Sequence, residues 1–111
     1  MKKLIGAALA AMVFCSPVQA SVGVASYYKT GRMTANGERF HPMGFTCAHR
    51  RLPFGTKLKV TNLRNGRTVI VRVNDRGPFI RGRVLDLSLG AARAIGMNGA
   101  GVAKISFVVM N

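Results

Sequence analysis

Residues 57–74 read KLKVTNLRNGRTVIVRVN, and this stretch constrains the fold more than any other part of the chain. Two runs within it, Lys57 to Leu63 and Arg67 to Asn74, alternate apolar and polar side chains, which is typical of strands that bury one face. The Asn65-Gly66 dipeptide between them favours the positive φ of a tight hairpin turn. The stretch therefore predicts two antiparallel strands, and the buried face of the second carries Val69, Val71 and Val73.

The chain on both sides of this hairpin also predicts short strands. Val22 to Tyr28 and Val102 to Met110 are strand-like runs near the two ends of the domain, and Val84 to Leu87 is a shorter run between them. Ser88 is a candidate helix N-cap, and Leu89 to Ile95 predicts one helical segment. Six or so short strands with one small helix favour a compact, mainly β barrel over an open parallel sheet.

Residues 29–44 separate the first strand from the hairpin and lack sustained periodicity. This segment contains Gly31, Asn36, Gly37, Pro42 and Gly44, so it predicts a long surface loop. Loops of this length without structure of their own are usually functional or disordered. The loop is therefore a candidate location for functional side chains.

The N-terminus has the pattern of a secretory signal peptide. Lys2 and Lys3 precede an apolar run from Leu4 to Phe14, and a small-residue ending follows at Val18 to Ala20. This run is too short for a permanent membrane span, which needs roughly 20 apolar residues. We therefore expect cleavage after Ala20, which gives a signal peptide (residues 1–20), one soluble domain (residues 21–111), and a periplasmic or secreted location.

The two cysteines carry separate expectations. A cysteine late in a bacterial signal sequence can accept a lipid anchor, but Phe14 stands before Cys15, where lipoprotein signals place a small residue. This favours a cysteine that is discarded with the signal peptide, and lipid anchoring through Cys15 is the alternative. Either way Cys47 has no partner for an intramolecular disulfide, so the fold must depend on its core.

The charge of the chain is strongly basic. Lysine and arginine number 17 against three acidic residues, and without Lys2 and Lys3 the domain carries a net charge of +12. Such a surface attracts polyanions, which for an exported protein include anionic wall polymers and membrane surfaces. No basic motif with interleaved aromatic residues points to specific nucleic-acid binding. We expect a monomer with no cofactor and no metal.

The scarcity of acidic residues is more informative than the excess of bases. Residues 21–111 contain only Glu38, Asp75 and Asp86. Surface carboxylates are normally numerous, so each of these three is a better candidate than usual for a functional role. Asp75 and Asp86 also have structural alternatives, Asp75 as a cap of the following turn and Asp86 as a cap or buried ion pair near the helix start.

Five motifs occur in order along residues 23–88: GVASYY (23–28), TANGE (34–38), AHRRLPFGT (48–56), VRVNDRGPF (71–79) and DLS (86–88). Together they make the chain resemble the rare lipoprotein A family of septal-ring lytic transglycosylases, and several motifs in order are more specific than one short pattern. The resemblance implies a six-stranded double-psi β-barrel over residues 21–111. It also implies endolytic cleavage of peptidoglycan glycan strands, especially strands without stem peptides, with formation of 1,6-anhydromuramic acid ends.

The resemblance also implies the site residues. It transfers catalytic roles to Glu38, His49 and Asp75, while Asp86 matches the aspartate that expansin-like barrels use in the same cleft. Glycosidic cleavage needs a carboxylic acid that protonates the leaving oxygen while positive charge develops on the sugar. We expect Asp75 to be the acid and base, with Glu38 and Asp86 as stabilising or positioning partners. The expected substrate-binding residues are Tyr27, Tyr28, Asn36, Asn74 and Arg76.

Two features depart from the family pattern. Lys29 stands where the family commonly has glycine after Tyr28. No peptidoglycan-binding domain of the kind found in septal members follows Met110, so we expect a free catalytic module rather than one recruited to the septum.

Other functions remain open from sequence alone. A non-catalytic, expansin-like wall-binding or wall-loosening module would need the same carboxylates, and a cationic polyanion-binding protein would need none of them. Cys47 and His49 are two residues apart, so an extended chain would place both side chains on one face as a nucleophilic pair. His41 is the only other histidine, and its spacing to Cys47 and His49 matches no recognised metal site.

Overall fold

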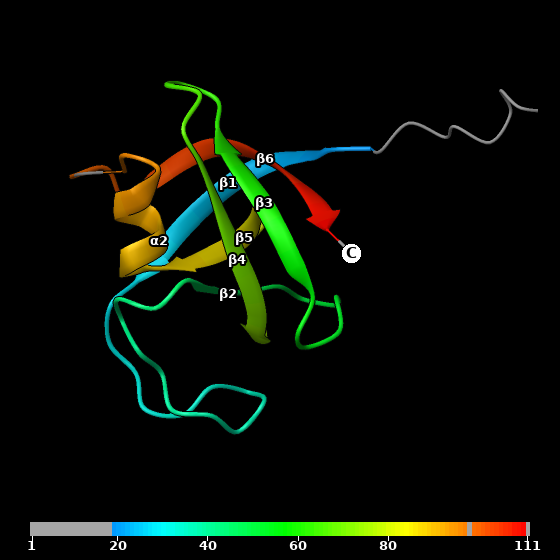
Figure 1. Ribbon diagram of the computed structural model, residues 1–111, viewed down its shortest axis with the longest axis vertical. Helices are drawn as coiled ribbons and strands as arrows, with labels where there is room; N and C mark the ends of the chain where they lie inside the picture. Colours follow the sequence, from blue (N-terminus) through cyan, green and yellow to red (C-terminus); the bar gives the residue numbers. More distant parts are fainter. Residues whose placement is uncertain (1–18, 98, 111) are drawn as a thin grey trace, which may run out of the picture.

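The computed structural model describes residues 19–97 and 99–110, so most of the predicted signal peptide, including Cys15, lies outside the described residues. Six strands close into a barrel in the order β1-β5-β2-β4-β3-β6 (Figure 1). The predicted mainly β barrel of six strands with one short helix is confirmed. The elements are β1 (Ser21–Tyr28), β2 (Thr46–Ala48), β3 (Lys57–Asn62), β4 (Thr68–Asp75), β5 (Arg83–Ser88), α2 (Leu89–Ala94) and β6 (Val102–Met110).

The predicted hairpin is present as β3 and β4, which pair antiparallel with Val60 opposite Val69. Gly66 adopts a φ of 76° in the connecting turn, as the Asn65-Gly66 pattern predicts. The three valines of β4 point into the barrel, with exposed fractions of 7% or less. The barrel also contains two parallel pairs, β1 with β5 and β2 with β4, which the hairpin pattern does not predict.

Strand β2 is the element that sequence analysis missed. It is three residues long, which is too short to show an alternation. Its position is fixed from both sides, because it pairs parallel with β4 and antiparallel with β5. Cys47 and Ala48 are buried there at 0% and 3% exposure. Three residues between two longer strands are therefore enough to help close the barrel.

The helix is shorter than predicted but begins where the sequence indicates. Ser88 is the N-cap of α2 and accepts a hydrogen bond from the backbone N–H of Ala91. The helix ends at Ala94 with Ile95 as its C-cap, whereas the prediction extended it through Ile95. Within residues 19–97 and 99–110, no helix has the length and apolar character needed to cross a membrane.

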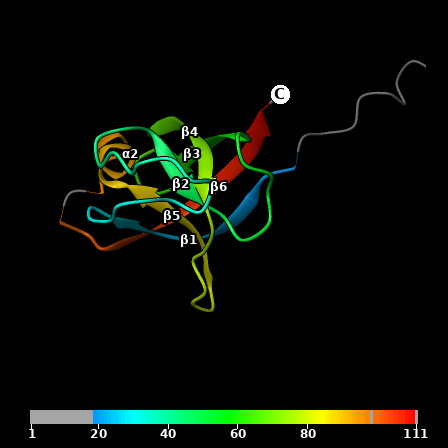
Figure 2. The same cartoon turned by 90° about the horizontal axis from the view of Figure 1, so that it is seen from below.

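Two long connections project from the barrel. Residues 29–45 form the predicted loop between β1 and β2, and only an isolated bridge between Met33 and Arg39 interrupts it (Figure 1). The connection between β4 and β5 extends away from the barrel in Figure 2 and exposes Phe79 and Ile80 by 78% and 54%. Both connections begin or end beside the strands that carry Asp75 and Asp86.

Candidate active site

Asp75 and Asp86 stand on either side of β2. Ala48 pairs with Asp75 of β4 on one side and with Asp86 of β5 on the other. Neighbouring strands lie about 4.8 Å apart, so this register brings together two carboxylates that are far apart in sequence, with only an alanine side chain between them. We refer to Asp75 and Asp86 as the carboxylate pair.

The two members of the carboxylate pair have different surroundings. Burial raises the pKa of the Asp86 carboxyl, and the charge of Asp75 adds to this, while a hydrogen bond from Ser26 and the charge of Arg83 act in the opposite direction. Ser26 Oγ donates to Asp86 Oδ1 over 3.0 Å. Asp75 Oδ1 instead accepts the backbone N–H groups of Ala35 and Arg76, each at 2.9 Å. Asp75 therefore does cap the turn that follows it, and one of its oxygens is committed to that turn.

Tyr28 connects the two carboxylates. Burial first, and then the charges of Asp75 and Asp86, raise the pKa of its hydroxyl, so the group stays protonated. Tyr28 Oη lies near Asp75 but is outside hydrogen-bond geometry, and it has no partner within the described residues. The ring stacks on Phe40 at 4.6 Å between centroids. Tyr28 is therefore a protonated, buried hydroxyl next to the carboxylate pair.

Glu38 is separated from the carboxylate pair by its own contacts. Arg72 forms a two-point ion pair with it, at 2.8 and 3.0 Å, and the amides of Asn74 and Asn36 donate to the same carboxylate. These donors, led by Arg72, lower the pKa of Glu38 to about 2, so it is ionised and cannot serve as the acid. We call these four residues the Glu38 clamp. The clamp attaches the β1–β2 loop to β4.

The Glu38 clamp uses two of the predicted substrate-binding residues, Asn36 and Asn74. Asn74 is 1% exposed, and its Oδ1 has no hydrogen-bond partner in the described part of the chain. The backbone N–H of Asn36 also donates to the carbonyl of Asn74. The observed contacts of both residues are therefore structural. Arg72 is the member of the clamp that sequence analysis did not select, although it lies on the same side of β4 as Asn74.

His49 and Arg76 support the turn that follows β2. His49 Nδ1 accepts the backbone N–H groups of Arg51 and Leu52 at 3.0 Å, and Arg76 donates to the carbonyls of His49 and Leu52 at 3.2 and 2.9 Å. The Arg76 guanidinium also lies 3.9 Å over the ring of Phe54. Within the described residues, the hydrogen bonds of the His49 imidazole are made with this turn and with no carboxylate.

His49 is neutral at pH 7. Burial lowers its pKa, and the charges of Arg76, Arg50 and Arg51 add to the effect. With Nδ1 accepting hydrogen bonds, the neutral ring carries its proton on Nε2. Cys47 points into the core, and burial raises the pKa of its thiol to about 12. The alternative of a Cys47–His49 nucleophilic pair is not supported, because burial keeps the thiol protonated and His49 Nδ1 accepts hydrogen bonds from Arg51 and Leu52 instead.

Tyr27 and Tyr28 are neighbours on β1 and take different directions. Tyr27 packs against the hydrophobic core and lines a hollow with residues of α2, including Ala92 and Arg93. Only Tyr28 is placed beside the carboxylate pair, because side chains alternate between the two faces of a strand. The structure therefore brings together Asp75, Asp86 and Tyr28 from the predicted set, and it adds Ser26.

A further hollow lies away from the carboxylate pair. It has a volume of about 720 Å³ and is lined by Phe54, Gly55, Thr56, Lys57, Ile70, Val109 and Met110. None of these residues belongs to the carboxylate pair. Within the described residues, no three His, Cys, Asp or Glu side chains gather as a metal site would require.

A closed barrel with two parallel strand pairs, and with two aspartates paired to the same residue of a short strand, defines the chain as a double-psi β-barrel protein with a carboxylate pair beside β2. The model of the family described as "Lytic transglycolase" matches residues 20–107. The chain belongs to this family.

Curated relatives agree with this assignment. A protein of Nostoc sp. (strain PCC 7120), named a probable endolytic peptidoglycan transglycosylase RlpA, is 60% identical over 93 residues, covering 79% of this chain and 25% of the relative. The endolytic peptidoglycan transglycosylase RlpA of Pseudomonas aeruginosa PAO1 is 52% identical over 87 residues, covering 76% and 25%. The chain thus spans about a quarter of the length of these relatives.

Solved structures share the barrel. An expansin of Clavibacter michiganensis superposes with a TM-score of 0.70 at 28% identity, over 84% of this chain and 51% of the expansin. A point mutant of that expansin, solved in complex with cellohexaose, gives a TM-score of 0.68 at 27% identity, over 84% and 51%. A Streptomyces papain inhibitor gives a TM-score of 0.70 at 24% identity, over 86% and 98%, which indicates the fold alone.

Proposed function

We propose that this protein is an endolytic peptidoglycan lytic transglycosylase. The observation that carries the proposal is the carboxylate pair, in which Asp86 has a pKa raised by burial and Asp75 lies across Ala48. Glycosidic cleavage needs a carboxyl that is protonated near neutral pH and a second group that stabilises the positive sugar. The names of the relatives support the same reaction.

The proposed reaction proceeds in two proton transfers. Asp86 donates its proton to the glycosidic oxygen, the C1–O bond breaks, and Asp75 stabilises the oxocarbenium ion. The C6 hydroxyl of the same muramic acid then attacks C1 and gives its proton to the Asp86 carboxylate, which forms the 1,6-anhydro ring and restores the acid. Tyr28 is a neighbour of the pair, and its protonated hydroxyl adds no negative charge there.

This assignment exchanges the roles that sequence analysis preferred. The sequence predicts Asp75 as the acid, but a general acid benefits from burial, and burial raises the pKa of Asp86. Asp75 Oδ1 already accepts two backbone N–H groups, so that oxygen does not carry a proton. In the proposal, His49 and Arg76 are positioning residues, and Glu38 holds the β1–β2 loop in place.

The proposal extends to the setting of the enzyme. The pattern of residues 1–20 supports export and cleavage after Ala20. In this proposal the exported protein acts on glycan strands as a monomer. Its basic surface favours contact with anionic wall polymers. N-terminal sequencing of the extracytoplasmic protein should begin at Ser21. A first residue of Cys15 with a lipid attached would instead establish anchoring.

The test of the reaction is product analysis. Sacculi stripped of stem peptides by an amidase are incubated with the protein, and soluble fragments are analysed by mass spectrometry for 1,6-anhydromuramic acid ends. We expect such ends from the native protein and from Lys59→Gln, whose side chain is exposed on β3, and none from Asp75→Asn or Asp86→Asn. Binding of sacculi without any anhydro ends would favour a non-catalytic, expansin-like module.

A further inference from the structure

The connection between β4 and β5 carries two exposed apolar side chains at consecutive positions. Phe79 is 78% exposed, the highest fraction among the large apolar side chains of the described residues, and Ile80 is 54% exposed. The connection projects away from the barrel (Figure 2), so this pair belongs to a convex part of the surface. We call Phe79 and Ile80 the apolar tip. Single exposed apolar side chains are normal on a protein surface, but an adjacent pair on a projection is a candidate contact surface.

The backbone that carries the apolar tip is held by hydrogen bonds within the protein. Arg50 donates through Nε to the carbonyl of Pro78 at 2.7 Å and through Nη2 to the carbonyl of Ile80 at 3.3 Å. The Ile80 carbonyl also accepts the backbone N–H of Arg83 at 3.1 Å. Carbonyls that already have donors can enter less polar surroundings at a lower cost than free carbonyls. The tip is therefore suited to burial against an apolar phase.

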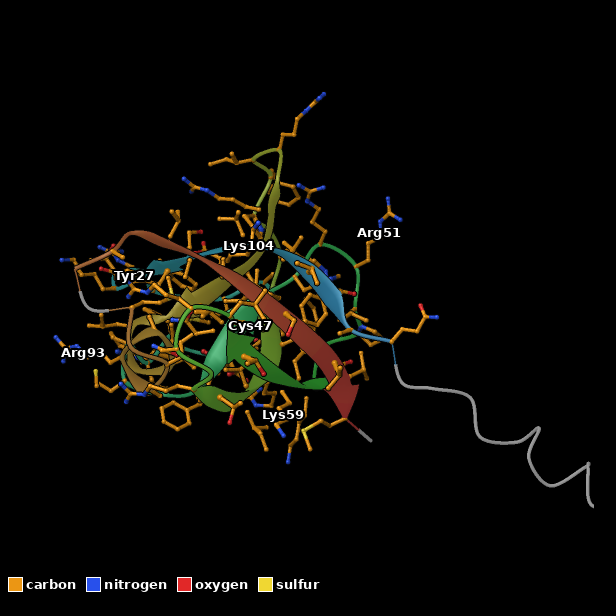
Figure 3. The ribbon with its side chains drawn as sticks, turned by 90° about the horizontal axis from the view of Figure 1, so that it is seen from above. Tyr27, Cys47, Arg51, Lys59, Arg93 and Lys104 are labelled. Atoms are coloured by element: carbon orange, nitrogen blue, oxygen red, sulfur yellow. The ribbon has the colours of Figure 1, made fainter. Side chains whose placement is uncertain are left out.

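Arginine side chains gather next to the apolar tip. Arg81 follows Ile80 in the sequence and is exposed. Arg50, which contacts the backbone of the tip, lines a hollow of about 200 Å³ together with Arg51 and Arg83, so these three residues are close neighbours. The Arg51 side chain extends outward from the molecule (Figure 3). We call Arg50, Arg51, Arg81 and Arg83 the arginine cluster.

The arginine cluster forms no ion pair within residues 19–97 and 99–110. The one ion pair found in that part of the chain joins Arg72 to Glu38. Asp75 accepts backbone N–H groups, and Asp86 accepts a serine hydroxyl. Arg83 is near enough for its charge to act on the Asp86 carboxyl, but the two groups are not paired. The apolar tip is therefore bordered by positive charge that is largely uncompensated.

We propose that the apolar tip and the arginine cluster form a contact site for an anionic lipid surface. Apolar side chains can enter the boundary between headgroups and acyl chains, while arginines bury their alkyl stems and keep the guanidinium in the headgroup region. Guanidinium groups also bind phosphate with paired, charge-assisted hydrogen bonds. Binding sites for small molecules are concave, whereas this tip is convex and lacks polar side-chain atoms, which favours a lipid surface. The inference goes beyond the proposed reaction and does not depend on it.

The first test follows the tip directly. The chain contains no tryptophan, so Phe79→Trp in the full chain introduces a single fluorophore at the tip. This protein is mixed with vesicles of phosphatidylcholine and phosphatidylglycerol whose acyl chains carry bromine, which quenches tryptophan on contact. We expect most of the emission to be lost, because the proposed contact places the side chain against the acyl chains.

Phe45→Trp is the matched control for this measurement. Phe45 is 51% exposed and directly precedes β2, whereas the turn that holds Arg50 follows β2. We expect its emission to be unchanged by the same vesicles. Both proteins carry the same residues 1–20, so any binding through that segment is common to them. Equal quenching of the two proteins would overturn the proposal, and so would the absence of quenching in Phe79→Trp, which would favour a protein or glycan ligand at the tip.

The second test measures the affinity that the apolar tip supplies. The tip variant combines Phe79→Ser with Ile80→Thr, and the control combines Leu63→Ser with Ile70→Thr, whose native side chains are 47% and 48% exposed. Sedimentation with vesicles containing phosphatidylglycerol should show about tenfold weaker binding for the tip variant, because two apolar side chains no longer leave water. The control should bind as the native protein does. Equal affinities of the two variants would contradict the proposal.

The third test separates the arginine cluster from the general basic charge. Arg81→Gln should weaken binding to the same vesicles about fivefold, as is typical for one basic residue at an anionic membrane surface. Arg93→Gln removes the same charge from α2, on the opposite side of the molecule from Arg51 (Figure 3), and should retain nearly the native affinity. Equal losses for Arg81→Gln and Arg93→Gln would indicate unspecific attraction of a basic protein and would refute the proposed site.

Discussion

The three acidic side chains of residues 21–111 differ in what surrounds each of them. Glu38 is neutralised by Arg72, Asp75 accepts two backbone N–H groups, and Asp86 is half-buried with one hydrogen bond from Ser26. A short list of acids is visible in the sequence, but their division into one ion pair and one carboxylate pair depends on neighbours that are remote along the chain. The pKa of each carboxyl follows from those neighbours.

The hydrogen bond from Ser26 opposes the effect of burial on the pKa of Asp86, and it provides the first prediction. The Ser26 hydroxyl stabilises the ionised carboxylate, so Ser26→Ala should raise the pKa of Asp86 further. Because the proposed acid must be protonated, cleavage falls as pH rises through that pKa, and the alkaline limb of kcat/KM should move to higher pH in Ser26→Ala. The measurement is a pH profile of anhydro-end formation. A limb that stays in place or moves to lower pH would exclude Asp86 as the acid.

His49 provides the second prediction at the scale of one side chain. His49→Ala leaves the N–H groups of Arg51 and Leu52 without their acceptor and should lower the free energy of unfolding by about 1–2 kcal/mol. His49→Asn places an oxygen near the position of Nδ1 and should recover most of that stability and of kcat. Urea unfolding measures the stability of each variant, and cleavage kinetics measure its activity. If His49→Asn and His49→Ala are equally inactive while His49→Asn is stable, the imidazole itself takes part in the chemistry.

Among the elements, the β1–β2 loop depends on the Glu38 clamp. Glu38 has a pKa of about 2 in the folded protein against 4.5 for the unperturbed group, so its ionised form stabilises the fold above about pH 4.5. This contribution is lost as pH falls from about 4.5 towards 2. The side chain is 35% exposed, so solvent screening limits the contribution to about 1 kcal/mol. Glu38→Gln should therefore be less stable at pH 7 and should lose less stability on acidification, as followed by urea unfolding at each pH. If the free energy of unfolding of the two proteins changes with pH by the same amount, the Glu38 clamp does not stabilise the fold in the way described.

The start of α2 packs tightly against the same loop. A Cβ at Gly90 would lie 2.5 Å from the backbone oxygen of Met43, so Gly90→Ala must displace either the helix or the segment that leads into β2. We expect a loss of about 1–3 kcal/mol, which is typical of overpacking, together with reduced cleavage because β2 separates the carboxylate pair.

Gly101→Ala is the control for this substitution, because nothing lies within 4 Å of a Cβ at that position. Thermal unfolding of the two variants should show a lower Tm for Gly90→Ala alone. Equal Tm values would indicate that the loop moves aside without cost.

At the scale of the whole molecule, the charge is a separate property from the site. The net charge of +12 for residues 21–111 should give weak binding to any soluble polyanion, such as polyphosphate. We expect this binding to disappear between about 0.05 and 0.5 M salt, because screening shortens the range of exposed charges. Binding of glycan oligosaccharides should persist over the same range and be lost in Asp86→Asn. Loss of both at the same salt concentration would favour a polyanion-binding protein without glycan specificity.

Much of the fold follows from local patterns. The β3–β4 hairpin, the strands β1 and β6, the N-cap at Ser88 and the long β1–β2 loop are all readable, because alternation, turn residues and caps act over a few neighbouring positions. Strand β2 could not be predicted from the sequence, because three residues are too few to show an alternation of apolar and polar side chains. Its pairing with β4 and β5 is a long-range contact.

The sequence by itself determined the mainly β barrel class and the short list of acids from which the site is built, while the export that its N-terminal pattern indicates stays a prediction. Only the tertiary structure decided that Asp75 and Asp86 form a pair while Glu38 joins Arg72, that Tyr28 faces the pair while Tyr27 faces the core, and that His49 supports a turn. The physical reason is that side-chain roles depend on distance, burial and hydrogen-bond partners. In a closed barrel these are set by strand register between segments that are remote along the chain.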